Sequence, residues 1–409
     1  MVVDEEQENS YKQDKKPRYN ARDLALMRAK ITNSIVILGS ATPSIESYYN
    51  AMQKKYKLLE LKNRIFNQSP PSIKIIDMRK EKGEIFSKEL IQVIKTKLEL
   101  KEQIILLLNR KGYSTFFLCK DCGNVLLCKN CNISLVYYQK NKVCKCHYCN
   151  YTKSVPEKCP KCESKNVNYF GMGTEKIESL AKKLFPESKI ARLDKDIISK
   201  KGNLEKILNL FHENKIDILI GTQIVAKGLN FPNVTLVGII SADTSLNLPD
   251  FRSEEKTFQL LTQVTGRTGR GEKLGETFIQ TFNPEIESIV LTGDYYSFYQ
   301  KEIFRRKQLL YPPFRKIIKI DIQGIDENKI QEIAIKIGKI IMANIKEKTN
   351  INILGPAPSP IFKIKKRFRY QIILLGENSQ KLHEIVMKSL PYFPTSYKID
   401  IDVDPVMML

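Results

Sequence analysis

The chain has 409 residues, 42% hydrophobic and 27% charged, which predicts two or three soluble domains with substantial cores. Its net charge of +22 favours a polyanionic partner such as nucleic acid, although an AT-rich genome would also explain part of the lysine excess. No apolar run is long enough to cross a membrane and the first residues do not resemble a signal peptide, so we expect a cytoplasmic protein with no membrane partner.

The chain begins with three apolar residues followed by the acidic cluster Asp4-Glu5-Glu6-Gln7, at the end of an expected strand. Helical spacing over 22–31, a buried strand and a loop that enters another helix predict that residues 1–60 are α/β. Residues 61–86 contain a Pro-Pro pair and few periodic positions, so they are predicted as a linker.

From residue 87 to about 290, strands alternate with helices, which predicts a parallel sheet covered on both faces. The expected strands are 104–109, 167–171, 189–194, 216–221, 234–241 and 276–282. The expected helices are 88–100, 175–185, 204–214 and 256–266.

The last part of the chain, assigned to residues 291–409, has a different pattern. From about Tyr311 the expected elements follow the order βαββαβ, which predicts a small ferredoxin-like α+β domain.

All nine cysteines lie within residues 119–162, and eight of them form four Cys-x-x-Cys pairs. The eight are Cys119, Cys122, Cys128, Cys131, Cys146, Cys149, Cys159 and Cys162. Paired thiolates suit tetrahedral zinc, so the block predicts two Zn²⁺ ions; an iron–sulfur cluster is the main competitor, but no four-cysteine ferredoxin run occurs.

Which of the four Cys-x-x-Cys pairs (knuckles) share a zinc ion is a separate question. The nested order would place Cys119 and Cys122 with the last pair, and the two inner pairs together. Cys144 is the odd thiol, interpreted as a spectator beside the second site. With all ligand positions filled, the block is predicted to be structural and an interaction surface.

Four further stretches lie just after a predicted strand or at the start of a predicted helix. Each of them alone is weak evidence for a binding site. They supply Thr42 in "LGSATPS", Gly171, Gly173 and Thr174 in "FGMGTEK", Thr222, Gln223 and Lys227 in "GTQIVAKG", and Gln263, Arg267 and Arg270 in "QVTGRTGR".

Together these stretches predict a nucleotide site. Arg267 and Arg270 can reach the charge that develops on a γ-phosphate. Asp4 can hold Mg²⁺ through water while Glu5 polarises the attacking water. Groups near Thr42 and Thr222 can follow a nucleic-acid backbone.

These motifs identify a resemblance to superfamily 2 helicases, specifically the PriA (primosomal protein N′) family of replication restart helicases. It is carried by "VVDEEQENSYKQ", "RYNARDLALMRA", "GSATPS", "LLLNRKGYS", the paired cysteines, "GTQIVAKGLNFPNVTLVGIISAD", "LNLPDFRSEEKTFQLLTQVTGRTGR" and "GPAPSP". The resemblance covers the whole chain. It implies part of a first RecA-like motor lobe in 1–60, a complete second RecA-like lobe in 87–290 that carries the zinc block as an insertion, and a terminal DNA-binding domain.

The resemblance further implies an ATP- and Mg²⁺-dependent 3′-to-5′ DNA helicase that acts at forks and on single-stranded DNA. Its implied partners are primosome proteins, single-stranded DNA-binding protein and the replicative helicase. It assigns the nested zinc pairing and makes residues 10–23 an aromatic-rich loop that couples DNA to ATP hydrolysis. We expect Tyr11, Arg18 and Tyr19 of this loop to bind DNA, and the basic stretch 363–370 is a further candidate.

Two departures from the family matter. Gln7 replaces a histidine; it can still hydrogen-bond towards Gln263 but cannot become cationic. No Gly-Lys-Ser or Gly-Lys-Thr occurs in the 409 residues, so the phosphate-binding loop that the family places upstream is missing.

We therefore expect the chain to be an amino-terminally truncated member that does not hydrolyse ATP alone, and residues 1–60 to expose apolar surface and to be poorly ordered by themselves. Three hypotheses remain: a motor half completed by another polypeptide, a non-catalytic DNA- and primosome-binding zinc module, and a truncated reading frame.

Overall fold

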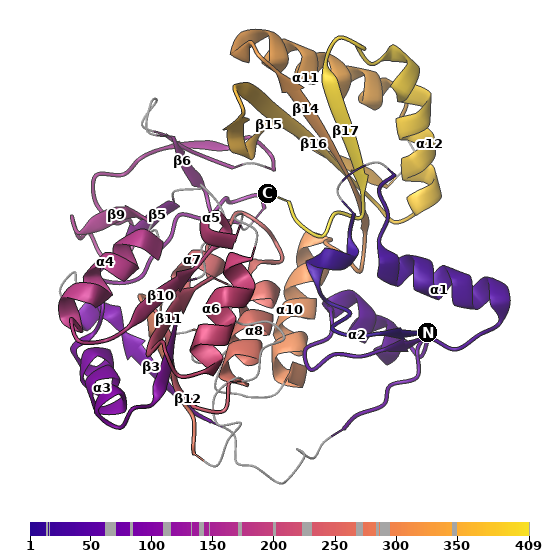
Figure 1. Ribbon diagram of the computed structural model, residues 1–409. Coiled ribbons are helices and arrows are strands. Elements are labelled where there is room, and N and C mark those ends of the chain that lie inside the picture. Colours follow the sequence, from indigo (N-terminus) through magenta and orange to yellow (C-terminus); the bar gives the residue numbers. More distant parts are fainter. Residues whose placement is uncertain are drawn as a thin grey trace.

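The computed structural model describes every residue except 14, 16, 62–70, 82–84, 109–115, 132, 139–142, 147, 171–173, 199–201, 223–230, 267–272, 284–285, 287–294, 346–349 and 409. Its elements form four sheets, arranged as a central layered unit, a zinc block, a C-terminal domain and a small N-terminal unit (Figure 1). Within the described residues, no helix has both the length and the apolar character needed to cross a membrane.

The central unit is a six-stranded parallel sheet with helices on both faces, as predicted. Alternate residues of the middle strand face opposite cores: Ile104 and Leu106 pack on one side, and Ile105 and Leu107 on the other. Across the sheet the strand order is β10 (Ile190–Leu193), β11 (Ile218–Gly221), β4 (Gln103–Leu107), β12 (Val234–Ile239), β13 (Glu276–Thr281) and β3 (Ser72–Asp77). The helices are α3 (Lys88–Glu99), α4 (Thr174–Leu184), α5 (Lys195–Ile198), α6 (Asn203–His212), α7 (Asp243–Leu246) and α8 (Ser253–Thr265).

Two predictions differ from the structure: the linker contains a strand, and one predicted strand belongs to another sheet. The segment 61–86, predicted as a linker, supplies β3, which pairs with β13 along its whole length and is followed by the short helix η3 (Met78–Lys80). The strand expected at 167–171 is β9 (Val167–Phe170), but it pairs antiparallel with β5 outside the central sheet. Local alternation of strands and helices could not reveal either partner, because pairing depends on tertiary contacts.

The zinc block has its own antiparallel sheet. Its strand order is β8 (Thr152–Ser154), β7 (Val143–Lys145), β6 (Val136–Tyr138), β5 (Phe116–Cys119) and β9. Short strands joined by cysteine turns leave little apolar material of their own, so the block shares a buried cluster with its neighbours.

The C-terminal domain has the predicted βαββαβ order: β14 (Lys316–Gly324), α11 (Glu327–Ala343), β15 (Ile351–Ile364), β16 (Arg367–Gly376), α12 (Ser379–Ser389) and β17 (Lys398–Val403), with the short helix η6 (Leu390–Tyr392) before β17. The sheet order β15-β16-β14-β17, all antiparallel, confirms the ferredoxin-like α+β fold. Both helices pack on one face of the sheet around Ile320, Ile337 and Leu382.

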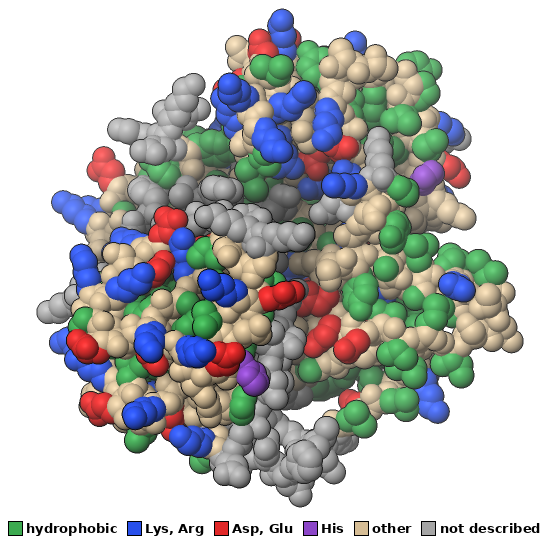
Figure 2. All heavy atoms as spheres, viewed as in Figure 1, with side chains coloured by type: hydrophobic (Ala, Val, Ile, Leu, Met, Phe, Trp, Pro, Cys, Tyr) green, Lys and Arg blue, Asp and Glu red, His purple; other side chains and the backbone are tan. Residues whose placement is uncertain are grey.

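The N-terminal unit contains only two strands among its described residues, β1 (Val2–Val3) and β2 (Ile37–Leu38), which pair in parallel, with η1 (Asn9–Tyr11), α1 (Ala21–Thr32) and α2 (Ile45–Met52). Helix α10 (Tyr295–Leu309), which was assigned to the C-terminal domain, packs instead against α2 and α8, where Tyr48 and Tyr299 lie 4.7 Å apart between ring centroids. The unit also leaves apolar side chains exposed, as expected: Val2, Leu24, Met27, Ile31, Ile35 and Ile37. Green apolar side chains gather over the α1 region in Figure 2. Its order in isolation stays a prediction.

Candidate functional site

The eight paired cysteines converge into two groups of four. Site A contains Cys119, Cys122, Cys159 and Cys162, and site B contains Cys128, Cys131, Cys146 and Cys149. Within each group the sulfur atoms all lie within 4.8 Å of one another, which confirms the nested pairing. Cys144 is buried and belongs to neither group among the described residues.

The donor set fits zinc. A tetrahedral Zn²⁺ with Zn–S bonds of about 2.3 Å requires sulfur–sulfur distances of about 3.8 Å. Across the knuckles, Sγ of Cys119 lies 3.6 Å from Cys162, and Sγ of Cys128 lies 3.6 Å from Cys149. Four thiolates per site leave no ligand position for a water molecule, so the sites are structural.

Site B is docked against both the second lobe and the C-terminal domain. The Tyr311 hydroxyl donates to the Cys131 carbonyl at 3.2 Å, and its ring stacks on Phe251 at 4.5 Å. The Tyr148 hydroxyl accepts the backbone N–H of Phe251 at 3.2 Å, and Met408 near the chain end is fully buried in the same cluster. The zinc block is therefore a packing element shared by the surrounding units.

The acidic cluster is hydrogen-bonded to the Ser-Ala-Thr loop. The Gln7 side chain donates to Glu5 Oε2 at 2.6 Å and accepts from Ser40 Oγ at 2.5 Å. Ser40 Oγ in turn accepts the Thr42 backbone N–H at 2.9 Å. Gln7 thus contacts Glu5 and Ser40, whereas the sequence predicted a contact with Gln263.

The two carboxylates predicted to handle Mg²⁺ and water differ in exposure: Asp4 is exposed, and Glu5 is half-buried with a left-handed φ of 47°. Helix α8 lies next to the Ser-Ala-Thr loop, and its Gln259 side chain donates to the Thr42 carbonyl at 3.4 Å. Gln263 lies one turn further along α8, on the same face.

Sequence reasoning missed Glu6, which is the buried member of the acidic cluster. Its carboxylate accepts from the Ser44 backbone N–H at 2.6 Å, from Ser47 Oγ at 3.0 Å and from Arg22 Nη1 at 3.0 Å. Burial opposes the charge on Arg22, but Asp23 and Glu6 raise the pKa of its guanidinium. The sequence did contain a clue to this structural role. Three acids stand in a row, and the predicted site needs only Asp4 for Mg²⁺ and Glu5 for water, so Glu6 was left without a function.

A second missed cluster joins the N-terminal unit to α8 and α10. Arg306 is fully buried and pairs with Glu255 at 2.6 Å, Glu302 at 2.7 Å and Glu46 at 3.2 Å. Burial opposes ionisation of Glu46, yet Arg252 and Arg306 lower its pKa to about 2. Breaking such a buried pair from one side is costly, so this cluster holds α2 of the N-terminal unit against α8 and α10.

The remaining residues predicted to bind ATP or DNA differ in how accessible they are. Thr42 is only 1% exposed, and Thr174 donates its hydroxyl to Asp194 at 2.8 Å, so neither side chain is available to a ligand in this structure. Thr222 follows β11 and is half-buried. Gly171, Gly173, Gln223, Lys227, Arg267 and Arg270 lie outside the described residues.

The aromatic-rich loop lies between the acidic cluster and the C-terminal domain. The Tyr11 hydroxyl donates to the Asp4 carbonyl at 2.6 Å, Arg18 contacts β17, and Tyr19 is 39% exposed. The basic stretch 363–370 forms the β15–β16 hairpin, where Lys363 lies over the Phe368 ring.

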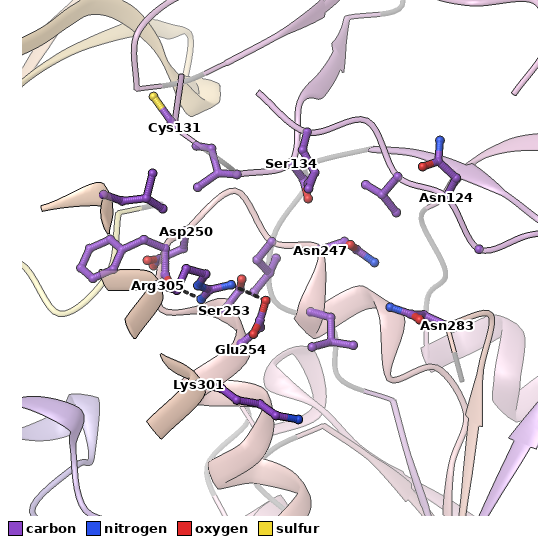
Figure 3. A pocket seen from close by; sticks show the side chains of 18 of the residues that line it. Asn124, Cys131, Ser134, Asn247, Asp250, Ser253, Glu254, Asn283, Lys301 and Arg305 are labelled. Atoms are coloured by element: carbon purple, nitrogen blue, oxygen red, sulfur yellow. Dashed lines mark hydrogen bonds and ion pairs between the residues drawn. The ribbon is translucent and has the colours of Figure 1, made fainter. Parts of the chain in front are cut away.

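A pocket of about 500 Å³ is lined by residues of the zinc block, the second lobe and α10 (Figure 3). Three carboxamides, Asn124, Asn247 and Asn283, line it together with Lys301, while Arg305 is paired with Glu254. Its lining offers hydrogen-bond donors and acceptors to a ligand.

Three family models match successive parts of the chain. Residues 128–153 match the PriA DNA helicase Cys-rich region domain, 153–272 match the helicase conserved C-terminal domain, and 307–406 match the primosomal protein N C-terminal domain. The replication restart protein PriA of Bacillus subtilis is 43% identical over all of this chain, and that of Rickettsia felis 42% identical over 99% of it. The chain belongs to the PriA family.

The helicase match identifies the parallel sheet as a RecA-like helicase C-terminal lobe, and the assignment of the N-terminal unit to the first lobe stays a prediction. The chain spans 52% of the length of the Bacillus subtilis PriA and 63% of the Rickettsia felis PriA. Among solved structures, Saccharomyces cerevisiae Dbp5 bound to RNA and ADP BeF3 covers 76% of this chain and is itself covered over 62% of its length. Its 14% identity and TM-score of 0.38 carry no argument about the site.

Proposed function

We propose that this chain is the part of a PriA-type replication restart DNA helicase that contains the acidic half of the ATP site, the second motor lobe, the zinc block and a terminal DNA-binding domain. Its substrates are ATP with Mg²⁺ and forked or single-stranded DNA. Its partners are primosome proteins, single-stranded DNA-binding protein and the replicative helicase.

The observation that carries this proposal is the connection from Glu5 through Gln7 and Ser40 to the Ser-Ala-Thr loop. A carboxylate that orients water at a γ-phosphate must be held by its surroundings, and here it is tied to the loop that α8 contacts. Arg267 and Arg270 follow α8 in the sequence, and we propose that they act on the same phosphate.

ATP hydrolysis by this machinery requires a phosphate-binding loop, and the 409 residues contain no Gly-Lys-Ser or Gly-Lys-Thr. We propose that a polypeptide carrying that loop packs on the exposed apolar face formed by β1, β2 and α1, which includes Val2, Ile35 and Ile37. Burying this face would extend the two-stranded sheet and complete the first lobe.

The test is DNA-stimulated ATPase activity of the chain, alone and mixed with the part of the Bacillus subtilis relative that precedes the matched region. We expect turnover only in the mixture, and a loss of about 100-fold or more with Glu5→Gln. Glu187→Gln, an exposed carboxylate on the far side of the second lobe, is the matched control and should leave turnover unchanged. Turnover by the chain alone that Glu5→Gln abolishes would overturn the requirement for a second polypeptide.

The second candidate function is a non-catalytic module that binds DNA and primosome proteins. The observation in its favour is that the zinc block and the β15–β16 hairpin are complete without any phosphate loop. DNA binding by the chain, with no ATP turnover even in the mixture, would favour this function over the first.

A further inference from the structure

Lys12 joins the aromatic-rich loop to the last strand of the C-terminal domain, at the opposite end of the sequence. Its ammonium lies 2.9 Å from Asp402 Oδ1 and donates to the Val403 carbonyl at 2.6 Å. The Lys12 side chain is only 6% exposed, although lysine ordinarily keeps its charge in water. Such burial indicates a specific contact and not an incidental surface pair.

Arg18 makes a parallel contact one step along the same strand. Its guanidinium donates to the Ile401 carbonyl at 2.9 Å and lies 3.5 Å from Asp400. Asp400 and Asp402 point to the same face of β17 because side chains alternate along a strand. The only other cation paired with either carboxylate among the described residues is Lys398, at 3.3 Å from Asp400.

The spacing of these carboxylates matches that of nucleic-acid phosphates. Two residues along a strand advance about 6.8 Å, which is close to the distance between neighbouring phosphates of a nucleic-acid strand. A lysine and an arginine that each bind one carboxylate of such a pair can therefore bind two phosphates in the same relative positions.

The same end of this loop is also tied to the acidic cluster. The Tyr11 hydroxyl donates to the Asp4 carbonyl, and a bridge between Lys12 and Asn20 closes the base of the loop. Lys12 is therefore adjacent in sequence to Tyr11, which contacts the acidic cluster, so a change of partner at Lys12 can affect that contact.

We infer that Lys12 and Arg18 form a phosphate-binding pair for single-stranded DNA, and that Asp400 and Asp402 occupy it as intramolecular substitutes for two phosphates. Strand β17 is thus a latch: it holds the loop while DNA is absent and must release it when DNA binds. This inference rests on the proposed DNA-binding function and adds to it both the role of Lys12 and the competing strand.

The decisive variant is Asp400→Asn/Asp402→Asn, which keeps side-chain shape and removes the competing charge. Binding of a fluorescein-labelled oligothymidylate to the full chain is measured by anisotropy over a range of salt concentrations. We expect several-fold tighter binding at low salt, and a salt dependence steeper by about 1.4, or 0.7 for each cation released to a phosphate. Adding Lys12→Gln and Arg18→Gln should reverse both changes.

The matched control is Glu332→Gln/Glu384→Gln. It removes two exposed carboxylates from α11 and α12 in the same domain, and so changes the net charge equally without touching the loop. An equal gain in affinity in both double variants would show that only net charge acts, and would overturn the latch. Weaker binding in the Asp400/Asp402 variant would also overturn it, because β17 would then support the DNA-bound loop.

Hydrogen exchange separates failure of the latch from failure of the proposed function. Faster exchange at residues 11–13 and 18–20 in the Asp400/Asp402 variant, with no change in the control, is the expected result. Wild-type binding with unchanged affinity and exchange in the variant would overturn the latch alone. If neither wild type nor variant binds the oligonucleotide, both the latch and the DNA-binding function are overturned.

Discussion

Sites A and B have the same four-thiolate ligand set but very different surroundings. At site B, Cys128, Cys131 and Cys146 are buried and the site contacts Tyr311, which precedes the C-terminal sheet. At site A, Cys162 is exposed and Cys122 half-buried. The same coordination chemistry therefore has different exposure: site B contacts the second lobe and the C-terminal domain, whereas site A buries Cys119 and Cys159 but leaves Cys162 at the surface.

A glycine makes the closest backbone contact beside site A. Gly123 has a φ of +72°, and a Cβ placed there would lie 2.1 Å from the Phe282 carbonyl oxygen at the end of β13. A close backbone approach thus joins site A to the second lobe, in addition to the burial of Cys119 and Cys159, whereas the rings of Tyr311 and Tyr148 pack at site B. This difference yields four predictions.

The largest effect is expected from replacing a ligand at the buried site. Cys131→Ser should lose one of two zinc ions and reduce the free energy of unfolding by on the order of 5 kcal/mol, because structural zinc contributes strongly to folding and this site also docks the C-terminal domain. Cys162→Ser should lose one zinc ion with a clearly smaller change. Zinc content and denaturant unfolding measure both effects, and equal destabilisation would contradict the comparison.

Tyr311→Ala should cost about 3–5 kcal/mol, since it removes a buried ring that stacks on Phe251. Tyr311→Phe keeps the ring and loses only the hydrogen bond to the Cys131 carbonyl, so it should cost about 1 kcal/mol. Both variants should retain two zinc ions. Loss of zinc from Tyr311→Phe would show that the hydroxyl holds the metal site and not its docking.

Gly123→Ala should destabilise the chain by about 3 kcal/mol, because it combines the strain of a positive φ with a clash against backbone. Gly202→Ala is the matched control: Gly202 also has a positive φ, of +83°, but nothing lies within 4 Å of the position that its Cβ would take, so a cost of about 1 kcal/mol is expected. Thermal unfolding compares the two. Equal costs would mean that the approach to Phe282 contributes nothing.

The smallest effect is kinetic. A chelator should remove zinc in two phases of one ion each, with release from site B roughly tenfold slower because its buried ligands need local opening. A colorimetric zinc indicator follows the release, and Cys162→Ser should show only the slow phase. A single phase in the wild-type chain would contradict the difference in access.

Much of this organisation was predictable from local patterns. Cys-x-x-Cys spacing indicated the ligands, and the βαββαβ order indicated the C-terminal fold, because both depend on residues close in sequence. The placement of β3 and β9 was not predictable, since a strand's partner is chosen by packing across the chain. Glu6 and Arg306 were missed for the same reason: a buried charge has no local signature until its partners, such as Ser44 and Glu255, are known.

The sequence by itself determined the zinc chemistry, the α/β alternation and the family, because these reside in residue types at short, fixed spacings. Only the tertiary structure decided that one zinc site is a docking element and the other a surface knuckle, and that Lys12 and Arg18 face Asp402 and Asp400. The physical reason is that burial and charge pairing are properties of neighbours in space, and these neighbours come from opposite ends of the chain.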